Sequence, residues 1–165
     1  MVATTSSGTA VVTLPTDTQI LITREFAAPK HLVYMAYTTP ELIKRWWSGD
    51  RGEVTSAEVD LRVGGMWRYV MTANGGFEVG FHGEYREIVP NERIVWTEIY
   101  EGAPDAEASA ATVTHTFTEK AGRTTLTMLM QCPTREIRDA IISSGMEGGL
   151  QEAMDHLEQV AISLG

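Results

Sequence analysis

The feature that most constrains the fold of this chain is a change of hydrophobic period near Pro133. Before it, from about residue 18, apolar and polar residues alternate in short runs that are typical of β-strands. After it, the spacing becomes helical to the end, with an apolar stripe at intervals of three and four: Met146, Leu150, Met154, Leu157, Ala161 and Leu164. One helix cannot cover both faces of a large sheet, so we expect the sheet to curve around the helix.

The order of the other elements follows from the same patterns. Thr18–Phe26 is expected as the first strand, and Pro29 and Pro40 as the starts of two short helices. Six further strands are expected, divided by Gly-, Pro- and Asn-rich turns, near residues 54–61, 66–72, 77–88, 93–100, 112–118 and 123–131. Short connections make neighbouring strands antiparallel. The predicted class is therefore α+β, with a curved antiparallel sheet of about seven strands around a long C-terminal helix.

Two segments interrupt this pattern. Residues 1–17 are rich in Thr and Ser and are expected to be flexible, with Ala10–Leu14 as a candidate for a short extra strand. Residues 18–165 are expected to form a single domain.

In the C-terminal helix, Gly145, Gly148 and Gly149 each cost about 1 kcal/mol relative to alanine, so we expect a break or kink near residues 143–149.

Composition excludes several functions. The net charge of −9 argues against nucleic acid as a partner, because phosphate binding needs a basic surface. Cys132 is the only cysteine, which prevents an internal disulfide and fits a cytoplasmic protein. No apolar run is long enough for a membrane span, and no signal peptide is recognised. Motifs for phosphate, zinc or nucleophile sites are missing, so we expect no metal and no cofactor.

His115 and Glu98 are the candidates for chemistry. His115 shares its strand face with Val113 and Phe117, which predicts an imidazole on the apolar side. Glu98 alternates in phase with Trp96, and if this face points inward it could pair with His115. If the opposite face points inward, Glu98 is solvated. The sequence leaves both arrangements open, and a buried histidine is more often structural than catalytic.

The remaining candidates concern a cavity between sheet and helix, where small molecules commonly bind. For Arg68, as for Glu98, the sequence does not decide whether its face of the strand points inward. If it does, Arg68 would anchor an anionic group of a ligand. Trp46 is expected to anchor the second short helix, and Trp47 to close the cavity mouth. The full set expected to line the cavity is Trp47, Trp67, Arg68, Phe81, Trp96, Glu98, His115, Phe117, Met146, Leu150 and Met154. The other histidines, His31, His82 and His156, are expected at the surface.

Four stretches carry a family resemblance: "REFAAPKHLVYMAYTTPELIKRWW", "VDLRVGGMWRYVM", "FHGEYREIVPNERIVWTE" and "SGMEGGLQEAMDHLEQV". They resemble the helix-grip superfamily of START-like and polyketide-cyclase-like domains, and within it the family of the C-terminal domain of the heat-shock-protein-90 ATPase activator. The resemblance implies a seven-stranded sheet on a C-terminal helix with an apolar cavity, and no single activity. Members often carry an aromatic residue where Leu150 stands, so a larger cavity is expected in this chain.

Three functions follow as hypotheses. The first is binding of a small lipophilic or aromatic molecule without catalysis. The second is a cyclase or hydrolase that uses His115 and Glu98 as base and orienting group. The third is a module that stimulates a chaperone ATPase, but the activator's N-terminal docking domain has no counterpart in these residues, so we do not expect a chaperone partner. The sequence favours a binding protein over an enzyme without deciding between them. It also leaves open whether the protein forms a homodimer.

Overall fold

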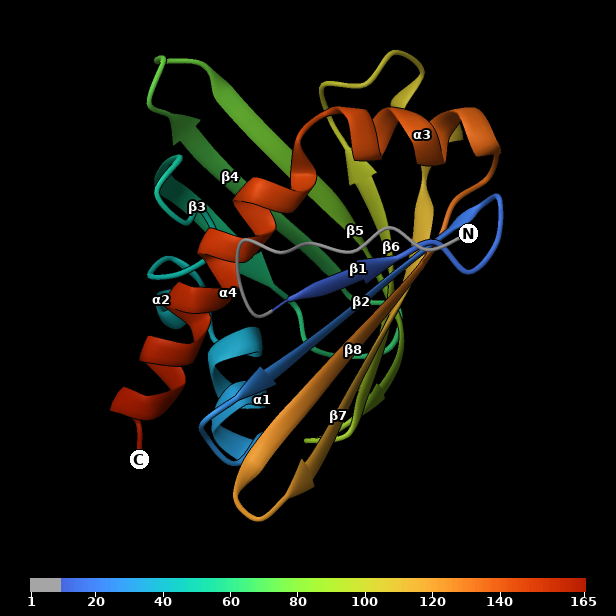
Figure 1. Ribbon diagram of the computed structural model, residues 1–165. Helices are drawn as coiled ribbons and strands as arrows, with labels where there is room; N and C mark the ends of the chain where they lie inside the picture. The colour runs from blue at the N-terminus through green and yellow to red at the C-terminus, as the bar shows by residue number, and fades with distance from the viewer. Residues whose placement is uncertain (1–9) are drawn as a thin grey trace.

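A curved sheet of eight antiparallel strands wraps around the helix α4 (Met146–Ser163) in the computed structural model, which describes residues 10–165 (Figure 1). The strands are β1 (Val11–Thr13), β2 (Gln19–Phe26), β3 (Gly52–Val59), β4 (Met66–Ala73), β5 (Glu78–Val89), β6 (Arg93–Tyr100), β7 (Ala111–Lys120) and β8 (Arg123–Gln131). The predicted α+β class, with an antiparallel sheet around a C-terminal helix, is confirmed. The eighth strand is β1, which lies within Ala10–Leu14.

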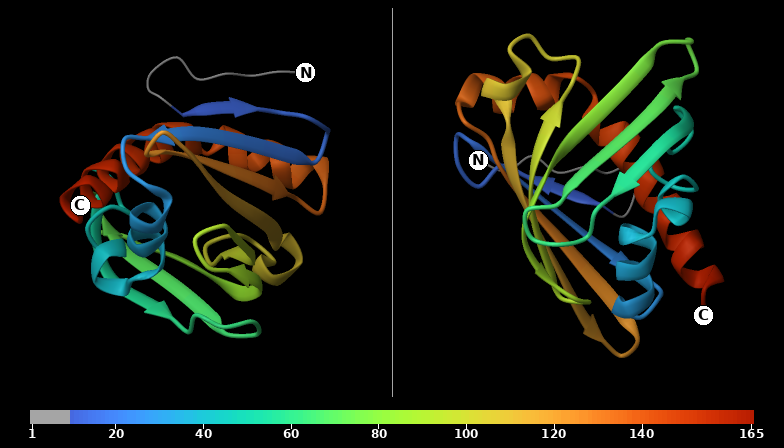
Figure 2. Two further views of the ribbon diagram at one scale, coloured as in Figure 1. Left: turned by 90° about the horizontal axis from the view of Figure 1, so that it is seen from below. Right: turned by 180° about the vertical axis from the view of Figure 1, so that it is seen from behind.

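The spatial order of the strands is β1-β2-β8-β7-β6-β5-β4-β3. The chain therefore returns to β2 with its last strand, and β1 and β3 form the two edges. Register shifts between Val54 and Ser56 and between Tyr85 and Glu87 mark bulges, which bend a strand locally. The sheet curves so strongly that β1 and β2 lie on the opposite side of the molecule from β4 and β5 (Figure 2).

In residues 10–165, four α-helices accompany the sheet. After β2 come α1 (Lys30–Thr38) and α2 (Pro40–Ile43), and after β8 come α3 (Arg135–Ser143) and α4. A short 3-10 helix, η1 (Ala106–Ser109), lies in the loop between β6 and β7. The break expected near residues 143–149 lies between α3 and α4, where Gly145 has a φ of 82° that disfavours other residues.

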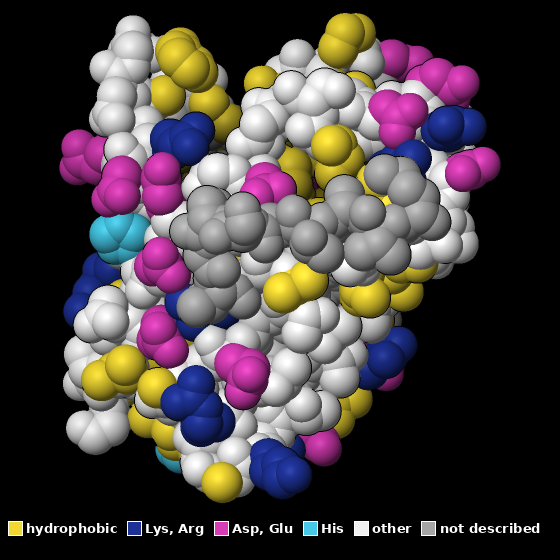
Figure 3. All heavy atoms as spheres, viewed as in Figure 1, with side chains coloured by type: hydrophobic (Ala, Val, Ile, Leu, Met, Phe, Trp, Pro, Cys, Tyr) yellow, Lys and Arg dark blue, Asp and Glu magenta, His cyan; other side chains and the backbone are white. Residues whose placement is uncertain are grey.

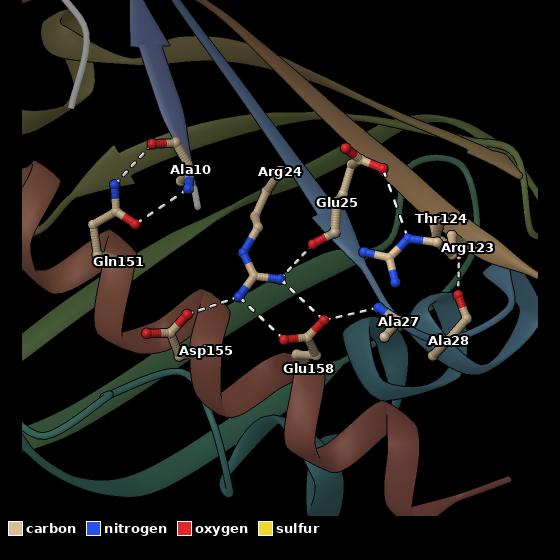
Figure 4. Close-up of polar contacts among 10 residues, drawn as sticks. All are labelled: Ala10, Arg24, Glu25, Ala27, Ala28, Arg123, Thr124, Gln151, Asp155 and Glu158. Atoms are coloured by element: carbon tan, nitrogen blue, oxygen red, sulfur yellow. Dashed lines mark hydrogen bonds and ion pairs between the residues drawn. The ribbon is translucent and has the colours of Figure 1, made fainter. Parts of the chain in front are cut away.

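The N-terminal residues are partly described. Residues 1–9, more than half of the segment expected to be flexible, lie outside the described residues. Ala10 is buried, and the amide side chain of Gln151 on α4 bonds to both its backbone nitrogen and its backbone oxygen, at 3.2 and 2.8 Å. Strand β1 is thus held to the helix as well as to β2 (Figure 4).

The second half of α4 is packed tightly against the sheet and α1. Leu157, Val160 and Ala161 are buried there with Phe26 and Leu126. These side chains fill the concave face at this end of the helix.

A buried arginine ties this end of the sheet to the helix. Arg24 points inward from β2 and is 2% exposed, and its Nη2 lies 2.7 Å from Asp155 Oδ1 on α4. Glu158, also on α4, lies 3.4 Å from the guanidinium and accepts a hydrogen bond from the Ala27 backbone (Figure 4). A buried guanidinium needs such partners, since an unpaired charge in the core is costly.

Within the described residues, no helix is long and apolar enough to cross a bilayer.

Candidate functional site

The first half of α4 does not fill the concave face, and a cavity of about 950 Å³ remains between the helix and the sheet. This volume lies within the range of small-molecule sites, about 300–1,000 Å³. Lining residues from the β4–β5 hairpin, such as Phe77, and from α3, such as Ile141, place the mouth between these two elements. Figure 3 shows a notch there with apolar side chains on its sides.

The alternation of each strand decides which side chains enter the cavity. On β6, Trp96, Glu98 and Tyr100 point inward, while Thr97 and Ile99 point to the convex face. Strand β7 contributes Val113 and His115, and β8 contributes Met128 and Met130. The walls are therefore mainly aromatic and aliphatic, with few polar groups.

His115 lines the cavity and is 1% exposed. Its Nδ1 lies 2.8 Å from the Tyr37 hydroxyl of α1, and its ring packs edge-on against Trp96 at 4.3 Å between centroids. Its Nε2 has no hydrogen-bond partner among the described residues. Burial lowers the pKa of His115 to about 3, so the imidazole is neutral at physiological pH.

Glu98 also lines the cavity, and its carboxylate accepts a hydrogen bond from Trp96 Nε1 at 3.1 Å. Burial raises the pKa of Glu98 to about 7, although the bond from Trp96 acts in the opposite direction. The inward orientation of Glu98, left open by the sequence, is therefore the one the structure adopts.

The pair of His115 and Glu98, which the sequence left open, does not form, although both side chains point inward. Glu98 lies opposite Ala111 and His115 lies opposite Ile94, so the two are four positions apart along the sheet. Four positions correspond to roughly 13 Å. Trp96 lies between them and contacts both. The geometry thus removes the base-and-orienter arrangement on which the enzyme hypothesis depended.

Most residues that the sequence placed in the cavity lie on its wall: Trp47, Phe81, Trp96, Glu98, His115, Met146, Leu150 and Met154. Trp67 and Phe117 do not line it. They face inward but lie beneath other rings, with Trp67 stacked on Trp96 at 4.4 Å and Phe117 packed against Tyr34 and Tyr37.

Arg68 is the other exception, because its strand face is the convex one. Its Nη2 lies 2.9 Å from Glu101 Oε1, and His82 Nδ1 lies 2.8 Å from the other oxygen of the same carboxylate. The bond from Arg68 lowers the pKa of Glu101 to about 2. Arg68 therefore anchors the start of the β6–β7 loop from outside and is not available to a ligand in the cavity.

The two adjacent tryptophans are placed differently. Trp46 is buried, donates from Nε1 to the Ala36 carbonyl at 2.9 Å and stacks on Tyr37 at 5.4 Å. Trp47 is half-buried and packs edge-on against Tyr69 and Phe81. Both rings reach the cavity wall, but only Trp46 is tied to the α1 backbone.

Sequence reasoning missed the contributions of α1, β8 and α3. Tyr37 is one of the buried residues of α1, but its contact with a histidine 78 residues away cannot be inferred from the sequence. Met128 and Met130 have the inward phase of their strand, which was a usable signal. The inward side chains of α3 are Ile137 and Ile141, which are four residues apart and line the cavity near its mouth.

The remaining polar candidates do not form a further site. Asp60 and Arg62 pair at 2.9 Å in the β3–β4 turn. His156 lies 2.9 Å from Asp50, and His31 is exposed. Within residues 10–165, no group of three or more His, Cys, Asp or Glu side chains is arranged to hold a metal ion.

A curved sheet that grips a C-terminal helix, with an apolar cavity between them, defines the helix-grip class of the START-like superfamily. The family model described as "Activator of Hsp90 ATPase homolog 1-like protein" matches residues 27–161. The chain therefore belongs to this family.

Solved structures agree with this assignment. A Rhodobacter sphaeroides protein is similar with 27% identity and a TM-score of 0.84, over 93% of this chain and 98% of that one. Two further proteins share the fold. The one from Mycobacterium smegmatis has 23% identity and a TM-score of 0.81 over 96% of each chain. The one from Nitrosomonas europaea has 24% identity and a TM-score of 0.79 over 91% of this chain and 97% of that one. A search of curated proteins found no match.

Proposed function

We propose that this protein binds a small, mainly apolar molecule in the cavity between the sheet and the first half of α4. The observation that carries the proposal is the cavity of about 950 Å³, whose wall is mainly aromatic and aliphatic. An apolar molecule that enters this cavity removes its own surface and that of the wall from water, which is favourable.

The wall composition supports a ring-containing ligand. Trp47, Tyr69, Phe81, Trp96 and Tyr100 present aromatic surface to the cavity. Methionines on β8 and α4 provide flexible side chains that adapt to an irregular shape. Catalysis is not part of this proposal, because His115 and Glu98 lie far apart.

The cavity can be probed by filling it from the helix. A Cβ atom added at Gly149 meets no atom within 4 Å, so a larger side chain there would project into free space. Gly149→Leu should therefore occupy the cavity without a clash. Gly149→Ala is the matched control, because it brings the same gain in helix propensity, about 1 kcal/mol, with little added volume.

The experiment is a titration with naphthalenemethanol followed by tryptophan fluorescence, since three tryptophans line the cavity. Wild type and Gly149→Ala should bind the probe with similar affinity, and Gly149→Leu about tenfold or more weakly. Absence of binding to wild type would overturn the proposal. So would equal affinity of wild type and Gly149→Leu, because the probe would then bind elsewhere.

A further inference from the structure

Among the described residues, the cavity wall has one ionisable carboxyl and no cation in a position to balance it. Among the described residues that line it, the side chains with a formal charge are Glu98 and Arg51. Arg51 lies at the rim, with half of its side chain exposed, and its Nε is 3.1 Å from Glu152 Oε1. Glu98, in contrast, has only the neutral indole N–H of Trp96 as its hydrogen-bond donor among the described residues.

The other titratable groups around Glu98 do not provide positive charge. They are the phenols of Tyr37 and Tyr69, the thiol of Cys132 and, further along the sheet, the imidazole of His115. Burial keeps each of them neutral at physiological pH, since it raises the pKa of the phenols and the thiol and lowers that of the imidazole. An ionised Glu98 therefore has no counter-charge among the described side chains around it, which is costly.

The surroundings of the carboxyl suit a cation. Trp96 and Tyr100 flank Glu98 on the same face of β6, and Phe81 lies opposite Tyr100. Aromatic ring faces attract cations. On the other side, the residue opposite Glu98 in register is Ala111, whose short side chain leaves room beside the carboxyl. The net charge of −9 also disfavours anionic ligands.

We infer that the cavity selects lipophilic amines, whose ammonium group would pair with Glu98 while the apolar body lies among the aromatic side chains. This inference rests on the proposed function and narrows its ligand class. It also excludes a class that an apolar cavity alone would accept, namely fatty and aromatic carboxylic acids, because their charge would face that of Glu98.

The test uses three probes with one ring system: naphthylmethylamine, naphthalenemethanol and naphthoic acid. Calorimetric titration at neutral pH should give about tenfold tighter binding for the amine than for the alcohol, and the weakest binding for the acid. In Glu98→Gln the amine and the alcohol should bind equally, because the amide keeps the shape and removes the charge. Equal binding of amine and alcohol to wild type, or a preference for the acid, would overturn the inference and leave the proposed function standing.

A measurement on wild type alone covers the case in which Glu98→Gln does not fold. Burial holds the pKa of Glu98 near 7, so the carboxyl is increasingly protonated as the pH falls below that value. The ratio of amine to alcohol affinity should therefore fall between about pH 8 and about pH 5.5, while the amine itself stays protonated. A ratio that does not change with pH would contradict the pairing with Glu98. Absence of binding by all three probes would instead overturn the proposed function.

Discussion

The two halves of α4 face the same sheet, but one half is packed and the other borders a cavity. In the second half, Leu157 is fully buried and Arg24 bridges strand and helix. In the first half, Gly149 adds no side chain and Leu150 is half-buried on the cavity wall. The difference shows that one amphipathic stripe can stabilise the core at one end of a helix and leave a cavity at the other.

The largest expected effect is a difference in unfolding free energy between variants of the two adjacent tryptophans. Trp46→Ala should cost about 3–5 kcal/mol of unfolding free energy, because it removes a buried ring and its bond to Ala36. Trp47→Ala should cost no more than about 2 kcal/mol, since its ring is only half-buried, and it should weaken probe binding. Urea denaturation and probe titration of both variants measure this. The reverse ranking in stability would show that Trp47 is the structural residue.

The next effect compares two leucines on the same helix. Leu157→Ala should lower the unfolding free energy by about 2–5 kcal/mol, because it opens a cavity in a packed region. Leu150→Ala makes the same chemical change but only enlarges an existing space, so we expect a loss of less than about 1.5 kcal/mol. Equal losses in chemical denaturation would mean that the first half of α4 is as well packed as the second.

A smaller effect concerns the pH dependence of stability. Glu98 has an ordinary carboxyl pKa of 4.5 when unfolded and a pKa of about 7 in the cavity. As the pH rises through this interval, the unfolded chain releases the proton and the folded chain keeps it, so the folded state loses stability. The loss is absent below the unfolded pKa and complete above the folded one.

Glu98→Gln removes this loss, since glutamine does not ionise. Relative to wild type, the variant should gain about 1–3 kcal/mol between about pH 5 and about pH 8. His115 titrates in the opposite direction, but it is present in both proteins and cancels in the difference. Urea denaturation at the two pH values checks this, and an unchanged difference would place Glu98 in contact with bulk water.

The sequence predicted most of the fold because its signals are local. Strand alternation, the prolines at 29 and 40 and the glycines near 145 each act within a few residues, and the element boundaries follow them closely. The alternation also identified the inward face of β7, and with it His115.

The site was harder to predict because it depends on register between distant strands. Alternation along one strand does not decide whether Arg68 and Glu98 point inward or outward. In the packed sheet, Arg68 points outward and Glu98 points inward. The separation of Glu98 from His115 is set by how β6 pairs with β7. Similarly, Trp67 and Phe117 point inward, but other aromatic rings pack between them and the cavity. The alternation of a single strand cannot reveal such packing.

The most direct test of the account is methyl NMR of the methionines during titration with naphthalenemethanol. Met71, Met128, Met130, Met146 and Met154 line the cavity, whereas Met35 and Met66 are exposed outside it, with Met66 on the convex face. We predict that the methyl signals of the first group shift on binding and that those of Met35 and Met66 do not. Shifts confined to Met35 or Met66, or no shifts at all, would contradict a ligand site between the sheet and α4.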